Sequence, residues 1–515
     1  MVCPSADNTL QPYGKSKVNK IKVLPSLAVI LFIASASIAS NIIYVDANSP
    51  NAPGSGTYAE PFRRIQDAID IAADGNIVEI QPGLYTGPGN FNLDPSGKSI
   101  TIRSVDPNAA ANTIIDPNKA GRGFIFQNGE DANCIISGLT IRNAQVTIGD
   151  NGAGIYCFNS SPTIHNCIIQ DSHALVSGGG IFFDHSNATA INCTIMGNIA
   201  DFEGGGIESV MSDLNILNCV IIDNNAPFGG GITCYSPGTA NLVNCTIVAN
   251  SALFAGGAVF CWSEGNVVIK NSILWANSAS EGTQLGLEEE GQASVIYCDV
   301  QGGQTGVYDP YEHLVWGQGN MDSDPCFASF DLEGDPAAWD FHLKSVYGRW
   351  NSTFHRIDLN NDGIINLVEF TRLADVWLLQ GTMPEDLDNS GTVDWMDMKL
   401  FAQYFLATNQ KDGWITDSNT SLCIDSGDPN SDWSIEPWPN GKRINMGAYG
   451  GTFQASKNGN PADFNIDHLV NFVDFAQMAN QWLTEQMGIE DLIKDGKIDF
   501  ADIAVFAENW LWEKK

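Results

Sequence analysis

Acidic and amide side chains recur at fixed steps in the last third of the chain, and their spacing suits a calcium ion. Residues 358–369 read DLNNDGIINLVE. A twelve-residue calcium loop takes oxygen ligands from positions 1, 3, 5, 9 and 12, a main-chain carbonyl from position 7, and a glycine at position 6. Gly363 occupies position 6, and the ligand positions hold Asp358, Asn360, Asp362, Ile364 (through its carbonyl), Asn366 and Glu369.

Three further segments fit the same template. Segment 386–397 offers Asp386, Asp388, Ser390, Thr392 (through its carbonyl), Asp394 and Asp397. Segment 463–474 has His468 in place of the glycine, which predicts a strained turn, and offers Asp463, Asn465, Asp467, Asn471 and Asp474. Segment 491–502 has Ile493 at position 3, which predicts the weakest loop, and offers Asp491, Asp495, Asp499 and Asp502. We therefore predict Ca²⁺ as the bound ion.

Each predicted loop is followed by apolar residues at one helical face, so a short helix is expected after every loop. The loops form two pairs, and within each pair the first positions lie 28 residues apart. This duplicated loop and helix resembles EF-hand and dockerin modules, and the resemblance implies docking onto a cohesin-like protein. Dockerins often carry Ser or Thr at loop positions 10 and 11, whereas this chain has Leu367-Val368, Trp395-Met396, Phe472-Val473 and Phe500-Ala501. A cohesin-like partner and a purely structural calcium module both stay open.

A second periodic pattern fills the middle of the chain. The dipeptide Asn-Cys places Cys167, Cys193, Cys219 and Cys245 at steps of 26 residues. A Gly-rich phrase keeps the same step and ends at Ile155, Ile181, Ile207, Ile232 and Val259. A constant period with alternating Ile, Val and Thr predicts short strands stacked as a solenoid. The stacked cysteines are predicted to be free, buried thiols, and the asparagine columns to lie at bends and bond along the stack.

The repeats resemble the right-handed parallel β-helix proteins of the pectin lyase-like superfamily. The predicted fold is mainly β, with a β-helix over residues 41–350 whose clear rungs cover 134–298. The family implies a helix that closes the first coil, and Ile65, Ala68, Ile69 and Ala72 share one helical face. Residues 413–455 are expected to complete the β-helix, with calcium-loop pairs at 351–412 and 456–515.

The strand after each Gly-rich phrase carries the candidate sugar-binding residues. If the aliphatic residue ending the phrase points inward, the residues one and three later point outward. This places an aromatic face at Tyr156, Phe158, Phe182, Tyr235, Phe260 and Trp262. Asp184 and Glu208 lie in the middle of that face, roughly 8 Å apart, a separation that suits an inverting glycosidase. The alternative is a solvated pair of acids on a face that only binds sugar.

Basic residues limit the alternatives within this family. Its calcium-dependent lyases use Arg or Lys as the base, yet no Lys or Arg occurs between Asn143 and Ile269. Basic candidates lie only outside that range, at Arg103, Arg122, Arg142 and Lys270. The regular rungs therefore disfavour a lyase site.

The net charge and the N-terminal segment indicate which partners and which location to expect for the protein. The chain of 515 residues has 25 Lys and Arg against 60 Asp and Glu, a formal charge of −35, which disfavours nucleic acid as a partner. Lysines precede an apolar run at 23–33, and small residues follow, which predicts a signal peptide over residues 1–40 cleaved after Ala36 or Ala39. We expect a secreted or cell-surface protein, with no membrane span after cleavage, that binds or processes extracellular polysaccharide. A polysaccharide hydrolase or lyase with dockerin-like modules is the alternative.

Overall fold

The fold was established from a computed structural model. It describes residues 41–50, 53–147, 149–351, 367–378, 387, 393, 397–398, 401, 410–411, 414–465, 467, 469–481, 489–490, 492 and 497–511. The predicted signal peptide lies outside these residues. In the described part of the chain, no helix has the length and apolar character needed to cross a membrane.

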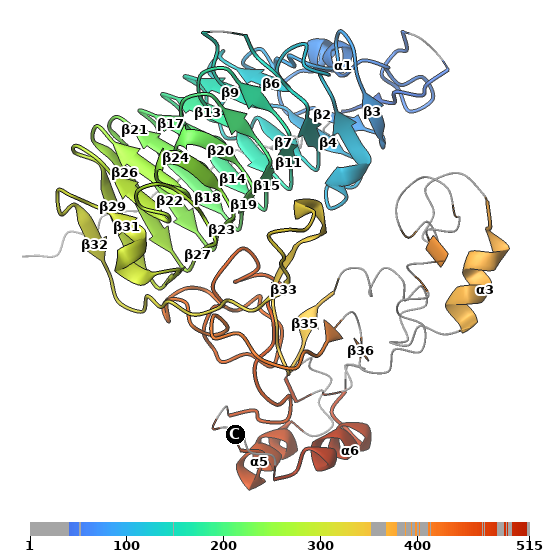
Figure 1. Cartoon of the computed structure of the whole chain (residues 1–515). Helices are drawn as coiled ribbons and strands as arrows, with labels where there is room; N and C mark the ends of the chain where they lie inside the picture. Colours follow the sequence, from blue (N-terminus) through green and yellow to red (C-terminus); the bar gives the residue numbers. More distant parts are fainter. Residues whose placement is uncertain are drawn as a thin grey trace, which may run out of the picture. The chain divides into compact units, whose positions relative to one another are not determined.

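Most of the described chain is a right-handed β-solenoid of about nine turns, so the predicted solenoid is confirmed (Figure 1). One turn runs through β9 (Ile155–Phe158), β10 (Thr163–His165), β11 (Ile168–Gln170) and β12 (His173–Ala174). The next turn begins at β13 (Ile181–Asp184), which pairs with β9 in parallel register. Equivalent strands of successive turns therefore build parallel sheets along the solenoid axis.

Two of these sheets are long. The 11-stranded sheet contains β10 and β1 (Ile42–Val45), β2 (Ile77–Ile80), β4 (Thr101–Ser104), β7 (Ile135–Ser137), β14 (Thr189–Ile191), β18 (Leu214–Leu217), β22 (Gly238–Val243), β26 (Gly265–Lys270), β29 (Gln292–Ile296) and β32 (Leu314–Trp316). The nine-stranded sheet contains β11 and β3 (Gly83–Tyr85), β5 (Thr113–Ile115), β8 (Thr140–Arg142), β15 (Thr194–Met196), β19 (Val220–Ile222), β23 (Thr246–Val248), β27 (Ile273–Trp275) and β30 (Asp299–Val300).

Two further sheets complete each turn. The eight-stranded sheet contains β9, β13, β6 (Phe124–Phe126), β17 (Ile207–Val210), β21 (Ile232–Tyr235), β25 (Val259–Trp262), β28 (Leu285–Leu287) and β31 (Val307–Tyr308). The four-stranded sheet contains β12, β16 (Ile199–Ala200), β20 (Asn225–Phe228) and β24 (Ser251–Ala255). The eight-stranded sheet carries the predicted sugar-binding residues.

The core is a stack of inward side chains that repeats once per turn. The aliphatic residues ending the Gly-rich phrases are buried, as predicted: Ile155, Ile181, Ile207, Ile232 and Val259. The cysteine column is buried beside them, and the described cysteines are free thiols. Each thiol has a carbonyl acceptor on the preceding turn; Cys245 Sγ, for example, lies 3.3 Å from Ile216 O. The column therefore needs no disulfides.

The two columns of stacked asparagine residues have different structural roles. The asparagines of the Asn-Cys dipeptides adopt left-handed φ angles between 51° and 53° and turn the chain: Asn166, Asn192, Asn218, Asn244 and Asn271. The second column, Asn198, Asn224, Asn250 and Asn277, forms a buried hydrogen-bond ladder. In it, Asn224 Nδ2 donates to Asn250 Oδ1 at 2.9 Å. The left-handed turns belong to the first column, in which Asn271 Nδ2 also donates to Asn244 Oδ1 at 3.2 Å, and the continuous ladder belongs to the second.

Glycine is required where successive turns approach most closely. A Cβ on Gly179 would lie 2.3 Å from Ile199 O and 2.5 Å from Gly205 O. Gly205 meets the backbone of the following turn in the same way. Any larger residue would push the turns apart, which explains why the Gly-rich phrase returns in each repeat.

The expected N-terminal helix is present as α1 (Ile65–Ile71). Its Ile65, Ala68 and Ile69 are fully buried and belong to the solenoid core. The helix contacts β1 and β2. Its predicted apolar face therefore packs onto the first turns of the sheet.

Beyond Met321, which adds one parallel bridge to the nine-stranded sheet, the residues after β32 do not extend the solenoid as expected. Antiparallel strands β33 (Phe327–Ser329) and β34 (Asp340–Leu343) and the largely irregular segment 416–457 pack outside the nine-stranded sheet. Phe341, Cys423 and Met446 share one apolar cluster with Val248 and Ile273 of that sheet. The outward side chains of the sheet are apolar there, so a covering layer is needed to exclude water from them. We call residues 320–350 and 414–457 the covering layer.

The remaining described elements lie within or beside the two predicted loop pairs. Strands β35 (Arg349–Trp350), β36 (Gln410–Lys411) and β37 (Trp414–Ile415) form an antiparallel sheet, so the chain leaves and returns at one place. Helices α3 (Leu367–Asp375), α5 (Phe472–Asn480) and α6 (Phe500–Glu508) lie within the two pairs. Short 3₁₀ segments occur at Ala110–Asn112, Gly303–Gly306 and Pro336–Ala338.

Candidate functional site

The loop at 463–474 brings its acidic residues together. One carboxylate oxygen from each of Asp463, Asp467 and Asp474 lies within 4.8 Å of the others. Asp474 is fully buried, and its Oδ1 accepts from Phe464 N at 2.8 Å while its Oδ2 accepts from Asn471 N at 3.0 Å. Three converging carboxylates repel one another unless a cation neutralises them, so the donor set fits a hard divalent ion.

The other loops repeat parts of this arrangement. The carboxylates at position 12 of all four loops are fully buried: Glu369, Asp397, Asp474 and Asp502. Asp502 and Asp397 each accept from the main-chain N–H at loop position 2, as Asp474 does, with distances of 2.7 Å from Leu492 N and 2.6 Å from Leu387 N. Helices α3, α5 and α6 each begin at position 10 of their loops.

The predicted ligands that lie outside the described residues are Asp358, Asn360, Asp362, Ile364, Asn366, Asp386, Asp388, Ser390, Thr392, Asp394, Asp491 and Asp495, and His468, at the glycine position, lies outside them too. Asn465 and Asn471 are described, and Asn471 caps α5 through its side chain and a reciprocal bond with Asp474. Asp499 and Asp502 form the same capping box at α6. The predicted ligand residues therefore also start the helices.

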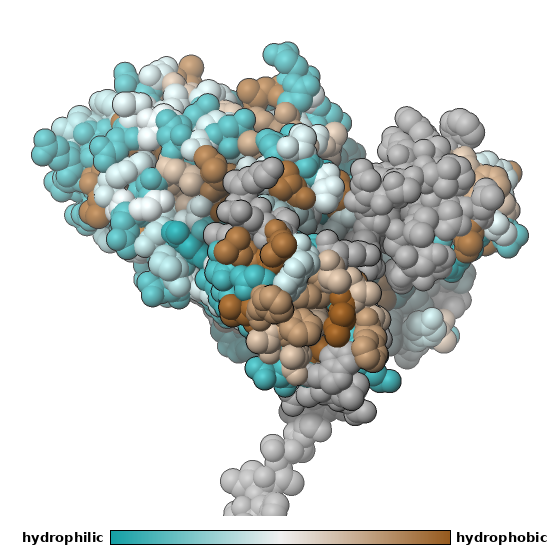
Figure 2. Space-filling view, turned by 90° about the horizontal axis from the view of Figure 1, so that it is seen from below, coloured by the Kyte–Doolittle hydropathy of each residue, from teal (hydrophilic) through white to brown (hydrophobic). Residues whose placement is uncertain are grey.

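The starts of α5 and α6 expose apolar side chains. Phe472 is 75% exposed, Val473 57% and Phe500 79%. They occupy loop positions 10 and 11, where the sequence departs from the dockerin pattern. Figure 2, seen from below, shows hydrophobic residues gathered over the part that lies lowest in Figure 1, where α5 and α6 are.

The predicted sugar-binding face separates into two columns on the eight-stranded sheet. The side chains of the inner column point away from the core; this column consists of Tyr156, Phe182, Glu208, Thr233 and Phe260. Nevertheless, Phe182, Glu208 and Phe260 are at most 4% exposed. Residues next to the four-stranded sheet cover the inner column; the Phe228 and Phe260 rings, for example, lie 5.1 Å apart. The expectation that all six aromatic residues are accessible is therefore wrong for Phe182 and Phe260.

The second column reaches the surface. Phe158, Asp184, Val210, Tyr235 and Trp262 lie in register on five successive turns, and none is buried. The rings of Tyr235 and Trp262 pack at 4.7 Å, and Phe158 is 37% exposed. We call these five residues the outer column.

Asp184 and Glu208 occupy very different environments. Asp184 belongs to the outer column, and its Oδ1 lies 2.5 Å from Nδ1 of His185. Glu208 is buried; desolvation, and then repulsion from Glu203, raise its pKa well above the usual range. Its Oε2 has no hydrogen-bond partner among the described residues. The Glu208 carboxyl group therefore lies beneath the surface, whereas Asp184 is partly exposed.

Glu203 is the residue that the sequence reasoning missed. It is 4% exposed, and desolvation raises its pKa to about 7, while the Trp262 indole, beside it but outside hydrogen-bond geometry, partly offsets that rise. Its position repeats along the chain, directly before the Gly-rich phrases, as Ser177, Glu203, Phe228, Ala255 and Glu281. Aligning the residue before each glycine run would have revealed this row.

The comparison with known proteins agrees with the fold. A family model described as "Right handed beta helix region" matches residues 100–274. This stretch is a right-handed β-helix. No curated protein matches the sequence.

Solved structures with similar folds are distant. Pectate lyase Pel9A aligns with a TM-score of 0.43 and 13% identity, over 80% of this chain and 97% of that chain. A rhamnogalacturonan lyase aligns with a TM-score of 0.30 and 14% identity, over 57% and 92%. An alginate lyase from Paenibacillus sp. strain FPU-7 aligns with a TM-score of 0.29 and 13% identity, over 55% and 99%. At such values the likeness carries no information on activity.

Proposed function

We propose that this protein is an exported, calcium-stabilised β-solenoid that binds extracellular polysaccharide. The observation that carries this proposal is the outer column, where three partly exposed aromatic rings lie in register on one sheet. Aromatic faces pack on the apolar faces of sugar rings and exclude water from them. Export rests on the N-terminal pattern, and protein recovered from the medium should begin after Ala36 or Ala39.

Calcium has a structural part in this proposal. The described carboxylates of the loop at 463–474 would hold the ion, and the ion would neutralise their charges and link the loop to α5. Asp474 orients the loop by accepting main-chain N–H groups at both of its ends. Calcium in the other three loops is proposed from their sequences and from their buried carboxylates at position 12.

The decisive experiment measures binding and product release on a panel of neutral and acidic polysaccharides, with calcium or a chelator. The Tyr235→Ala/Trp262→Ala variant should bind about tenfold more weakly, because two stacking rings are lost. Tyr311→Ala, which removes an exposed ring 55% accessible elsewhere, is the matched control. Wild-type protein that binds no polysaccharide would refute the proposal.

A polysaccharide-degrading enzyme is the alternative, and the same panel separates the two. Asp184 as base and Glu208 as acid would be required for hydrolysis. Product release by the wild type that is lost in Asp184→Ala/Glu208→Gln would establish it. Binding without products is what the buried position of Glu208 leads us to expect.

Docking onto a cohesin-like protein is a second proposed role for the calcium modules. The exposed Phe472, Val473 and Phe500 favour it, because apolar side chains clustered at helix starts suit a protein interface. Titration with purified cohesins should show calcium-dependent binding that Phe472→Asp/Phe500→Asp abolishes. Absence of binding to the whole cohesin panel would leave calcium with the stabilising role alone.

A further inference from the structure

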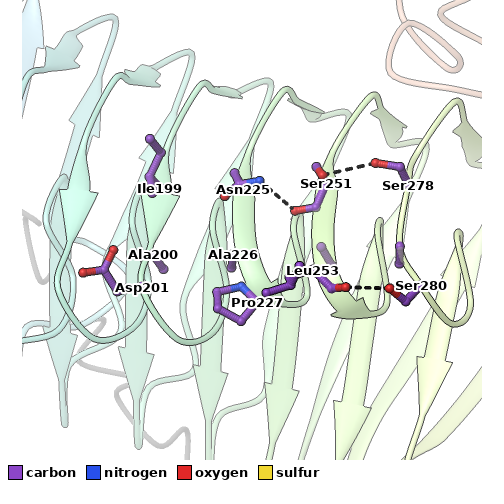
Figure 3. A pocket seen from close by; sticks show the side chains of 12 residues that line it. Ile199, Ala200, Asp201, Asn225, Ala226, Pro227, Ser251, Leu253, Ser278 and Ser280 are labelled. Carbon is purple, nitrogen blue, oxygen red and sulfur yellow. Dashed lines mark hydrogen bonds between the residues drawn. The ribbon is translucent and has the colours of Figure 1, made fainter.

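The four-stranded sheet carries a groove of about 630 Å³ that no predicted residue lines. Strands β16, β20 and β24 and residues 278–280 of the next turn form it (Figure 3). Its lining repeats once per turn, so the groove continues across four turns. At ~4.8 Å between neighbouring strands, this is a length of about 15 Å.

Strand geometry explains the shape of the groove. Alternate residues of a strand point to opposite sides, so the alanine row points inward and leaves a low floor of main chain. The residues on either side point outward and form two ridges. One ridge consists of Ile199, Asn225, Ser251 and Ser278, and the other of Asp201, Pro227, Leu253 and Ser280.

The two ridges differ in chemistry. The first offers an amide and two hydroxyl groups: Ser278 Oγ donates to Ser251 Oγ at 3.2 Å, and Asn225 Nδ2 donates to the main-chain oxygen of Ser251 at 3.5 Å. The second combines the apolar Pro227 and Leu253, which is 63% exposed, with the polar Asp201 and Ser280. Next to it, the exposed rings of Phe202 and Phe254 flank Phe228, with ring centres 6.4 Å and 5.1 Å from the Phe228 ring.

Charge decides which polymer fits. Asp201 is the charged side chain of the lining, and its carboxylate lies 2.7 Å from Nε2 of His173. The sequence from Asn143 to Ile269 contains no Lys or Arg to neutralise a polyanion. The carboxylate of Asp201 would therefore repel an acidic polysaccharide. A neutral polysaccharide carries no charge for it to repel.

We propose that this groove binds a linear, neutral polysaccharide lying along the solenoid axis. Sugar hydroxyl groups would bond the Asn225–Ser251–Ser278 ridge, and sugar faces would pack on Leu253, Phe202 and Phe254. The inference rests on the proposed polysaccharide partner and adds a second surface and a substrate class. The ring contacts Phe254–Phe228–Phe260–Trp262 connect the groove with the outer column, passing through the buried Phe260.

The test compares variants of the full chain in titrations with soluble neutral polysaccharides and with polygalacturonate. Phe202→Ala/Phe254→Ala and, separately, Leu253→Asp should each weaken neutral-polysaccharide binding about tenfold. All three side chains are at least 50% exposed, so thermal unfolding should not change. Leu84→Asp, which alters a leucine 50% exposed on β3, is the matched control.

The outcomes separate this inference from the proposed function. Binding that is lost in Tyr235→Ala/Trp262→Ala but kept in the groove variants would overturn the groove and leave the outer column. Polygalacturonate bound more tightly than neutral polymers would overturn the proposed substrate class. Self-association that Leu253→Asp abolishes, without effect on sugar binding, would assign the groove to a second copy of the chain. A wild type that binds no sugar would overturn both proposals.

Discussion

At the scale of single residues, two buried acids, Glu203 and Glu208, lie beneath the outer column. Glu203 and Glu208 are each 4% exposed, and for both, desolvation is the main cause of a raised pKa. Neither has a basic partner, because the repeats around them contain no Lys or Arg. Burial therefore favours the protonated form of each group over its charged form.

This arrangement predicts that Glu203 makes stability depend on pH. Its pKa is about 7 in the folded chain and near 4.5 in the unfolded chain, so the unfolded chain releases the proton first as pH rises. Its contribution is therefore complete below pH 4.5 and is lost as pH rises through 7. Relative to wild type, Glu203→Gln should gain about 2–3 kcal/mol in unfolding free energy between pH 4 and pH 8.

Chemical denaturation at several pH values, with a chelator present throughout, checks this prediction. Glu281→Gln is the matched control, because Glu281 occupies the same row three turns further on and is exposed. Parallel pH curves for wild type and Glu203→Gln would contradict it.

At the scale of elements, the asparagine ladder and the calcium loops connect neighbouring segments through polar groups. Asn224 is fully buried and makes four bonds: its Nδ2 donates to Ile195 O and Asn250 Oδ1, and its Oδ1 accepts from Asn198 N and Nδ2. Each ladder residue thus satisfies main-chain groups that the bend between sheets leaves unpaired.

Asn224→Ala should lower the free energy of unfolding by about 3 kcal/mol. The substitution leaves buried N–H and C=O groups of neighbouring turns without partners, at ~1–3 kcal/mol for each group. Asn241→Ala is the control, because the Asn241 side chain is partly exposed and its bonds to Leu214 O and Asn215 Oδ1 are long, at 3.4 Å. Equal losses in the two variants, measured by denaturant titration, would contradict a special role for the ladder.

Calcium should stabilise the C-terminal module through the loop at 463–474. At 100-fold excess over its dissociation constant, one bound ion adds ~2.7 kcal/mol to the unfolding free energy. Asp467→Ala removes one of the three converging carboxylates and should abolish most of this calcium dependence. Calorimetry with calcium and with chelator measures it, and Glu290→Ala, at an exposed site on the solenoid, should behave like the wild type. A melting profile insensitive to calcium would refute the site.

At the scale of the whole molecule, the covering layer completes the solenoid. Asn218 Nδ2 donates to Ala448 O at 3.0 Å and to Gly450 O at 2.8 Å, and Ala448 N donates to Thr246 Oγ1. Cys423 Sγ lies 2.9 Å from Oδ2 of the buried Asp299. The polar side chains at the turns thus hold the layer in place, while its apolar residues cover the nine-stranded sheet.

Loosening this layer should expose the sheet. Phe341→Ala removes a ring that is 4% exposed and lies 5.0 Å from the Phe327 ring, and should cost about 3 kcal/mol. Increased binding of a hydrophobic dye below the unfolding transition should accompany the loss. Phe453→Ala, which removes a ring 60% exposed, should cause neither effect. A Phe341→Ala variant with wild-type stability would show that the layer is not needed.

The sequence alone determined the solenoid, because equivalent residues recur along the chain at a regular spacing. The 26-residue step of Asn-Cys and of the Gly-rich phrase fixes which residues stack, so the inward column and the buried thiols were correctly predicted. Strand alternation also placed Glu208 on the outward side of its strand. These features depend on contacts between equivalent positions of neighbouring turns, which a repeat makes visible.

Only the tertiary structure determined which outward residues are buried and which segments bury them. The burial of Phe182, Glu208 and Phe260, the position of Glu203 beside Glu208, and the placing of residues 414–457 outside the sheet all depend on packing between non-equivalent positions. The groove also depends on tertiary packing, because two rows of outward side chains stand on either side of a row of inward alanines. A sequence repeat specifies that equivalent residues of successive turns stack on one another. Whether an outward residue is buried depends instead on contacts with adjacent sheets and with the covering layer.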